Sequence, residues 1–188
     1  MRIIAGEAKG HALYAPQGTE TRPTSDKIRG SLFNIIGSRV TDARVLDLFG
    51  GTGALALEAL SRGAESAAVA DSARAAQQAI DRNGRSVLKS EYDYRLNLLR
   101  QDYRSAIAAL EGQIFDLVFL DPPYHMADAY GDALSRLYAA DMLAPGCLII
   151  LERRKGTQVL LPEAFNVFDT RLYGDTAVDF VEVGADGA

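Results

Sequence analysis

The sequence has little of what disulfide-rich, metal-binding or membrane proteins need. Its 188 residues include one cysteine, Cys147, and two histidines, so they offer neither a disulfide within the chain nor a cysteine-rich metal site. No apolar run approaches the ~18 residues of a membrane span, and the first residues lack the apolar stretch of a signal peptide. We therefore expect a cytoplasmic protein without a metal, of about one domain with a small extension.

Positive charge is also scarce, and it is unevenly distributed. The net charge is −5, which by itself argues weakly against a nucleic-acid partner. Residues 1–44 carry seven Lys and Arg against four Asp and Glu, whereas residues 45–188 carry thirteen against twenty-one. The sequence therefore predicts a basic N-terminal segment on an acidic body.

From residue 44 onward, short apolar runs alternate with helical patterns. The expected strands cover residues 44–48, 66–70, 94–100, 115–120 and 147–153. The expected helices cover residues 53–62, 72–89, 103–110 and 128–142. Two last β-prone runs, 166–173 and 176–183, are joined by Gly174-Asp175 and predict a hairpin. This pattern predicts an α/β fold with a doubly wound parallel sheet and an antiparallel edge hairpin.

The first 43 residues are expected to form an extension of the domain over 44–184. Two β-prone runs, 2–5 and 11–14, predict a small hairpin, and Thr24 or Ser25 is predicted to cap a helix. The apolar face expected for that helix consists of Ile28, Leu32, Ile35 and Ile36. Lys27 and Arg29 lie off this face, where we expect them to meet solvent or a phosphate. Hairpin and helix are expected to pack beside the glycine-rich loop that follows.

That loop comes directly after the strand predicted to end near Asp47. Gly51 and Gly53 lead into the next helix, and glycine lets the main chain adopt a positive φ and approach a ligand closely. The spacing Gly51-x-Gly53-x-x-Ala56 matches the dinucleotide fingerprint, and Asp71 lies 20 residues after Gly51, where an acid that binds ribose is expected. The spacing therefore predicts a nucleotide-containing cofactor, but it does not separate NAD from S-adenosylmethionine.

Asp47 favours S-adenosylmethionine over NAD. A carboxylate beside the glycines would repel a pyrophosphate, whereas it suits the ammonium group of an amino-acid cofactor. Asp71 would accept hydrogen bonds from ribose hydroxyls. Asp102 is a candidate for binding the adenine amino group, although an acid at a helix start is also a cap. The predicted cofactor-binding residues are Asp47, Phe49, Gly51, Thr52, Gly53, Asp71 and Asp102.

A second polar loop, Asp121-Pro122-Pro123-Tyr124, follows the apolar strand predicted over 115–120. The two prolines stiffen the main chain and remove two N–H donors, so neighbouring carbonyls face outward as acceptors. The Asp121 carboxylate and the Pro122 carbonyl would bind both protons of an exocyclic amine, which directs its lone pair at a methyl sulfonium. Asp121 would also take up the released proton, and Tyr124 would stack on the base. These four residues are the predicted catalytic set.

Further motifs accompany the two loops along the chain. They are Arg22-Pro23-Thr24, Lys27-Ile28-Arg29 with Leu32-Phe33-Asn34, and Glu58-Ala59-Leu60-Ser61-Arg62-Gly63-Ala64. With them, the chain resembles the RsmD-type family of 16S ribosomal RNA guanine-N2 methyltransferases over nearly its whole length. The resemblance implies a monomer with a Rossmann-like, seven-stranded methyltransferase sheet.

The same resemblance implies methyl transfer from S-adenosylmethionine to N2 of one guanine of 16S rRNA in an assembling small ribosomal subunit. The RNA-facing part would then be the basic N-terminal extension, residues 1–43. Its candidates for phosphate contact are Arg2, Lys9, Arg22, Lys27 and Arg29.

Four other functions are compatible with part of the pattern. DNA adenine-N6 and protein glutamine-N5 methylation use a related Pro-Pro-aromatic loop, but by resemblance those loops more often begin with Asn than with Asp. An NAD-dependent oxidoreductase leaves Asp47 and the loop at 121–124 unexplained, and the sequence has no Tyr-x-x-x-Lys pair. A non-catalytic RNA-binding assembly factor has no need of an intact Asp121.

Overall fold

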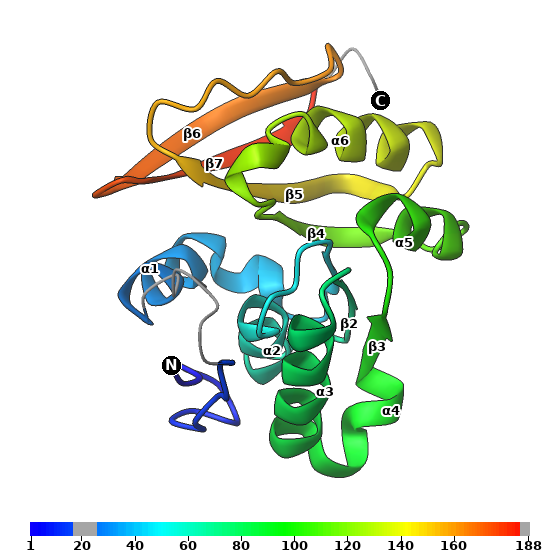
Figure 1. Ribbon diagram of the computed structural model, residues 1–188. Helices are drawn as coiled ribbons and strands as arrows, with labels where there is room; N and C mark the ends of the chain where they lie inside the picture. Colours follow the sequence, from blue (N-terminus) through cyan, green and yellow to red (C-terminus); the bar gives the residue numbers. More distant parts are fainter. Residues whose placement is uncertain (17–25, 185–188) are drawn as a thin grey trace.

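The computed structural model describes residues 1–16 and 26–184, which form one seven-stranded sheet flanked by helices (Figure 1). The strands lie in the order β3-β2-β1-β4-β5-β7-β6. Their bounds are β1 Arg44–Asp47, β2 Ser66–Ala70, β3 Leu96–Leu99, β4 Phe115–Leu120, β5 Leu143–Arg154, β6 Phe165–Tyr173 and β7 Thr176–Val183. Strands β1 to β5 pair in parallel, and β7 pairs antiparallel with both β5 and β6. The predicted doubly wound α/β fold with an antiparallel C-terminal hairpin is therefore confirmed.

The direction of strand addition reverses at β1, in the middle of the sheet. From β1 the chain adds β2 and then β3 on one side, and it returns to place β4 on the other side. Val45 of β1 pairs with Leu117 of β4, 72 residues further along the chain. The carboxyl ends of β1 and β4 are thus adjacent, and the loops that leave them meet at the kind of crevice where open α/β sheets bind ligands.

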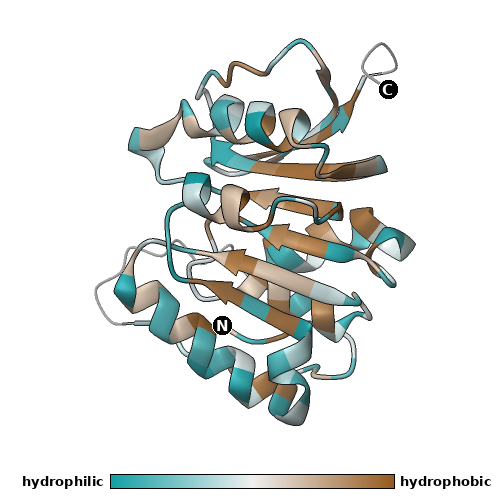
Figure 2. Cartoon of the chain, turned by 90° about the vertical axis from the view of Figure 1, so that its right-hand side faces the viewer, coloured by the Kyte–Doolittle hydropathy of each residue, from teal (hydrophilic) through white to brown (hydrophobic). Residues whose placement is uncertain are grey.

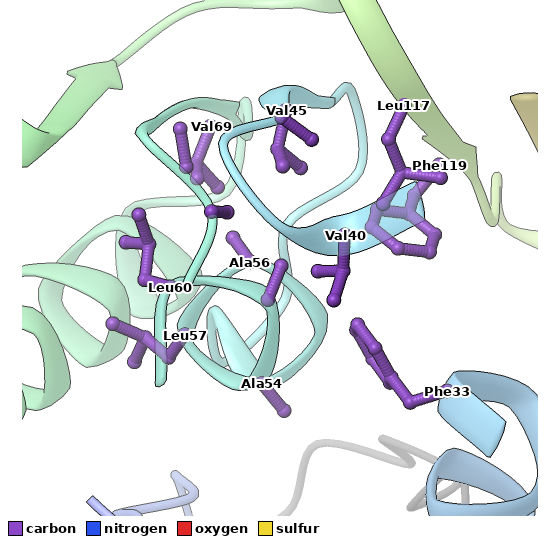
Figure 3. Packing of buried hydrophobic residues seen from close by; sticks show 14 of the residues in the cluster. Phe33, Val40, Val45, Ala54, Ala56, Leu57, Leu60, Val69, Leu117 and Phe119 are labelled. Atoms are coloured by element: carbon purple, nitrogen blue, oxygen red, sulfur yellow. The ribbon is translucent and has the colours of Figure 1, made fainter. Parts of the chain in front are cut away.

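Helices cover both faces of the sheet and bury its apolar side chains. The helices are α1 Asp26–Ile36, α2 Ala54–Ser61, α3 Arg74–Leu88, α4 Tyr92–Arg95, α5 Tyr103–Ala109 and α6 Ala129–Ala139. Side chains of α1, α2 and α3 share one core cluster, and those of α5 and α6 share a second. In Figure 2 the central strands are largely hydrophobic, whereas the helices carry many hydrophilic residues. Figure 3 shows α2 packed on the sheet, with Phe33 of α1 directed toward Phe119 at a ring distance of 5.9 Å.

Several predicted boundaries differ from those of the structure. The strand expected over 94–100 begins only at Leu96, because α4 occupies the four residues before it. Arg95 at the end of α4 donates hydrogen bonds to the carbonyls of Leu60 and Ala64, so contacts with a distant helix end determine this turn. The two runs of the expected N-terminal hairpin pair through one antiparallel bridge, Arg2 with Ala12, and through main-chain hydrogen bonds from Ile3 to His11 and from Leu13 to Met1. The helix caps predicted at residues 24 and 25 lie outside the described residues.

The buried face of α1 also differs from the predicted one. It consists of Arg29, Leu32, Phe33 and Ile36, while Ile35 is 40% exposed. The expectation that Arg29 is free to face solvent or a phosphate is therefore wrong. The Arg29 side chain is fully buried, and its charge is compensated there by two acidic groups, Asp26 on the same helix and Glu58 on α2.

The most important of these acidic groups is Glu58, in the middle of α2. Its buried carboxylate accepts hydrogen bonds from the main-chain N–H groups of Ile4 at 2.7 Å and Ala5 at 3.0 Å. It also accepts one from Arg62 Nε at 2.7 Å and lies 3.6 Å from Arg29 Nε. One carboxylate thereby joins the N-terminal segment, α1 and α2.

The N-terminal segment reaches the glycine-rich loop as well. Tyr14 exchanges two main-chain hydrogen bonds with the side chain of Asn83 on α3, and Asn83 donates another to the carbonyl of Thr52 at 2.8 Å. The Thr52 hydroxyl lies 3.4 Å from the sulfur of Met1. A Cβ on Gly6 would lie only 1.8 Å from the Ser61 carbonyl oxygen, so glycine permits this close approach to α2. The segment therefore lies beside the glycine-rich loop, as expected.

Candidate functional site

The glycine-rich loop leaves β1 and is held in shape by main-chain hydrogen bonds. Gly50 donates to the carbonyl of Ala70 at 2.9 Å, which ties the loop to the end of β2. Gly51 and Gly53 have φ angles of 56° and 78°, a left-handed conformation in which other residues are strained. A Cβ on Gly51 would meet no atom within 4 Å, so the main chain here borders open space. Gly53 precedes α2 as its N-cap.

Asp71, just after β2, uses both carboxylate oxygens to fix the neighbouring loops. One oxygen accepts from the N–H of Gly51 at 2.9 Å, and the other accepts from the N–H of Ala73 at 2.8 Å. Asp71 thereby connects the glycine-rich loop with the start of α3. Each carboxylate oxygen retains a second lone pair, so further acceptance from a hydroxyl group is compatible with this arrangement.

Asp102 is the N-cap of α5. Its carboxylate accepts from the hydroxyl of Ser105 at 2.9 Å and from the N–H groups of Arg104 and Ser105. The Ser105 hydroxyl and these N–H groups lower the pKa of Asp102, so its carboxylate remains charged at neutral pH. The structure thus shows the capping role considered from the sequence, on a residue that also borders the cavity described below.

Asp47 ends β1 and is 2% exposed. One of its oxygens accepts from the N–H of Phe49 at 3.2 Å. Burial raises its pKa to about 7, with a further contribution from the negative charge of Asp71, although the Phe49 hydrogen bond acts in the opposite direction. A cation placed beside a buried carboxylate strongly favours the charged form of that carboxylate.

The loop after β4 presents Asp121 and Tyr124 outward, while Pro122 is buried. Tyr124 is 53% exposed and begins the 3-10 turn Tyr124–Met126. The N–H of Met126 donates to the Pro123 carbonyl at 2.8 Å and closes this turn. An aromatic face and a carboxylate therefore stand at the carboxyl end of β4.

A cavity of about 610 Å³ joins the two loops. All four predicted catalytic residues border it, as do all the predicted cofactor-binding residues except Gly53. Its other lining includes Met1, Tyr103 and Glu152, which the sequence did not mark, and Arg29, which was expected to contact phosphate. Tyr103 contacts Phe49 at a ring distance of 5.4 Å and donates a hydrogen bond to Asp132.

Two of these residues carry charge. Arg29 donates through Nη2 to Asp26 and to the carbonyl of Arg2, while its Nη1 has no hydrogen-bond partner among the described residues. Glu152, on β5, is 9% exposed. The strand order would have located Glu152, because it lies one position beyond Leu151, the partner of Leu120, and thus beside Asp121. No local pattern places Arg29 at the cavity.

The candidates for phosphate contact are only partly brought together. Arg2 is exposed and lies 3.7 Å from Asp26, and Lys9 and Lys27 are exposed. Lys9 borders a separate cavity of about 430 Å³ together with His11 and Lys89. Of the five candidates, only the buried Arg29 borders the main cavity, and Arg22 lies outside the described residues.

Within residues 1–16 and 26–184, no group of three or more His, Cys, Asp or Glu side chains is arranged to hold a metal ion. In the same part of the chain, no helix combines the length and apolar character needed to cross a membrane.

The strand order and the terminal antiparallel hairpin define the class I methyltransferase fold. A solved structure named "Putative methyltransferase yhhF" from Escherichia coli shares it, with a TM-score of 0.83 and 28% identity over 98% of both chains. The chain belongs to the family described as Conserved hypothetical protein 95, whose model matches residues 1–182.

Named relatives agree with this assignment. The chain is 42% identical to "Putative rRNA methyltransferase YlbH" of Bacillus subtilis over 126 residues, which cover 66% of this chain and 67% of that protein. It is 30% identical to "Ribosomal RNA small subunit methyltransferase D" of Haemophilus influenzae over 175 residues, which cover 93% of this chain and 89% of that protein. The resemblance to the RsmD-type family predicted from the sequence is confirmed.

Proposed function

We propose that this protein transfers a methyl group from S-adenosylmethionine to the exocyclic N2 amine of a guanine in small-subunit (16S) ribosomal RNA. The observation that carries the proposal is the cavity shared by the glycine-rich loop with Asp47 and the loop with Asp121. One loop suits a cationic nucleoside cofactor, and the other suits a flat base with an amine. The rRNA methyltransferase names of the relatives support the substrate class.

The residues at the first loop fit S-adenosylmethionine. Asp47 would hold the ammonium group, and Asp71, already bonded to Gly51, would hold the ribose hydroxyls. Arg29 also borders the cavity, and its buried Nη1 has no hydrogen-bond partner among the described residues, so its positive charge suits the carboxylate of the same ligand. Asp102 and the ring of Phe49 would border the adenine. When bound, the cofactor supplies an electrophilic methyl group on a sulfonium.

The residues of the second loop would prepare the amine. The Asp121 carboxylate and the Pro122 carbonyl would accept hydrogen bonds from its two N–H groups, so the nitrogen lone pair would be directed at the methyl group. Tyr124, half-exposed at the mouth of the loop, stacks on the base, a contact worth ~1–3 kcal/mol. Asp121 would then accept the proton released as the N–C bond forms and the bond between the methyl carbon and the sulfonium sulfur breaks. Much of the rate would come from this positioning.

The basic N-terminal extension would face the RNA. We propose that residues 1–43 form this extension and that residues 44–184 form the methyltransferase domain. Arg2, Lys9 and Lys27 are exposed on the described part of the extension, and together with Arg22 they are the candidates for phosphate contact. The proposed partner is 16S rRNA within an assembling small subunit, bound by a monomer.

Cofactor binding is expected to depend on pH through Asp47. Its pKa of about 7 in the free protein means that the neutral form increases as pH falls below 7, and only the charged form attracts an ammonium group. The Kd for S-adenosylmethionine should therefore rise by about tenfold between pH 8 and pH 6. Titration calorimetry at several pH values measures this change. Asp47→Asn should bind weakly with a nearly flat profile, and an equally steep profile in that variant would contradict the assignment.

Transfer of a labelled methyl group tests the proposed function. Unmodified small subunits, naked 16S rRNA, DNA and a protein fraction would each be incubated with the protein and labelled S-adenosylmethionine. Product nucleosides and amino acids would be resolved by mass spectrometry. We expect label in N2-methylguanosine from the small-subunit sample. Label in N6-methyladenosine or N5-methylglutamine, or none despite measured cofactor binding, would overturn the proposal.

A further inference from the structure

A second carboxylate, that of Glu152, borders the cavity beside Asp121 and has no role in the proposed methyl transfer as described so far. Glu152 is the tenth residue of β5 and borders the cavity together with Asp121 and Tyr124. It is more than nine-tenths buried. A buried carboxylate on the wall of a binding cavity favours donors and cations among the groups that approach it, so its chemistry bears on what the cavity accepts.

The strand register places Glu152 next to the loop Asp121-Pro122-Pro123-Tyr124, which is proposed to bind the amine. Leu120, the last residue of β4, pairs with Leu151 of β5 in parallel register. Asp121 and Glu152 follow these two residues directly and are therefore neighbours across adjacent strands. Successive side chains of a strand alternate between the faces of the sheet. Since Leu120 and Leu151 point into the core under α5 and α6, Glu152 points to the opposite face.

Contacts on β7 and α6 fix the position of Glu152. Its partner on β7 is Val178, which belongs to the core cluster of α1, α2 and α3 and so agrees with that orientation. The hydroxyl of Tyr130 on α6 donates a hydrogen bond to the Glu152 carbonyl. The carboxylate is thus carried by a paired strand rather than by a mobile loop, which suits a group that must discriminate between ligands.

The edge of guanine that bears N2 presents two adjacent kinds of donor. The N2 amine lies next to N1–H, whereas the amine of adenine lies next to N1 as a lone pair. A site for guanine therefore needs an acceptor for N1–H beside the acceptors for the amine. An acceptor in that position meets the lone pair of adenine N1 and repels it.

We propose that Glu152 reads the base by accepting the N1–H of guanine while Asp121 and the Pro122 carbonyl hold N2. This inference rests on the proposed function and deepens it, because it names the residue that selects guanine over adenine at the same site. Glu152 forms no covalent bond and takes up no proton. Sites built to bind an N–H or O–H group discriminate by orders of magnitude against analogues that lack it.

The test uses Glu152→Gln and the base analogue 2-aminopurine, which keeps the N2 amine but has a lone pair at N1. After the methylated position is mapped with the wild-type protein, RNA carrying guanine or 2-aminopurine there would be compared by kcat/KM. The wild type should prefer guanine by roughly 10²-fold or more. The carboxamide introduced by Glu152→Gln can donate to the N1 lone pair of 2-aminopurine. The variant should therefore lower the ratio of kcat/KM for guanine to kcat/KM for 2-aminopurine by at least roughly tenfold.

Two controls separate this role from others. Glu182→Gln, on the exposed side of β7, should keep the wild-type preference. Cofactor affinity and thermal unfolding of Glu152→Gln should match those of the wild type, which establishes that the fold is intact. An equal loss of kcat/KM on both bases would overturn base reading and indicate a positioning role. If the wild type makes no N2-methylguanosine, the proposed function itself fails, and the selection of guanine fails with it.

Discussion

Asp121→Ala is expected to lower the kcat of methyl transfer by roughly 10³-fold, the middle of the range for loss of a general base and of a positioned acceptor. The variant removes the carboxylate that holds one amine proton and receives it during the reaction. Asp121 is exposed at the end of β4, so the fold does not depend on burying it. The measurement is single-turnover methyl transfer to the substrate found active with the wild type.

Cofactor binding distinguishes a chemical defect from a folding defect in this variant. The Kd for S-adenosylmethionine should remain within about twofold of the wild-type value, because Asp121 belongs to the amine side of the cavity. Asp128→Ala, which removes an exposed acid shortly after the same loop, is the matched control and should keep full activity. Unchanged turnover in Asp121→Ala would contradict the proposed mechanism and would favour a non-catalytic RNA-binding protein.

Glu58→Ala is expected to lower the free energy of unfolding by about 3–5 kcal/mol, the usual cost of removing one partner of a buried ion pair. The variant leaves the buried Arg29 guanidinium facing one fewer carboxylate and leaves the N–H groups of Ile4 and Ala5 without their acceptor. Urea-induced unfolding measures this change. Since the N-terminal segment contacts Thr52 through Met1, weaker cofactor binding should accompany the loss of stability.

An exposed acid just before β2 provides the comparison. Glu65→Ala should change the free energy of unfolding by no more than about 0.5 kcal/mol, as surface substitutions usually do. If Glu58→Ala were as stable as Glu65→Ala, the buried network would not be what holds the N-terminal segment on α2.

The sheet and the two loops were predictable because their signals are local. An apolar run that ends at Asp47 or Asp121, followed by glycines or prolines, combines hydrophobic patterning with residues whose main-chain preferences are strong. The edge hairpin was likewise predictable from two β-prone runs around Gly174. These features depend on neighbours in sequence, so no knowledge of tertiary contacts was required.

Arg29 and Glu152 were not predictable in the same way. A charged residue on a helix is ordinarily assigned to the solvent side, and Arg29 departs from this only because Glu58, 29 residues away, lies against it. The placement of Glu152 requires the strand order, which pairs β5 with β4. The turn at α4 is similar, since the partners of Arg95 are the distant carbonyls of Leu60 and Ala64.

The reversal of strand order at β1 has a consequence for the order of folding. Pairing β1 with β2 joins Arg44 to Ser66, whereas pairing β1 with β4 joins Val45 to Leu117. Loop closure costs about 0.6 kcal/mol for each doubling of length, so the second pairing costs about 1 kcal/mol more. Pulse-labelled hydrogen exchange should therefore protect the amides of β2 before those of β4. A chain emerging from the ribosome would complete the β1 and β2 side of the cavity, with the glycine-rich loop, before the side formed by β4 and the loop of Asp121.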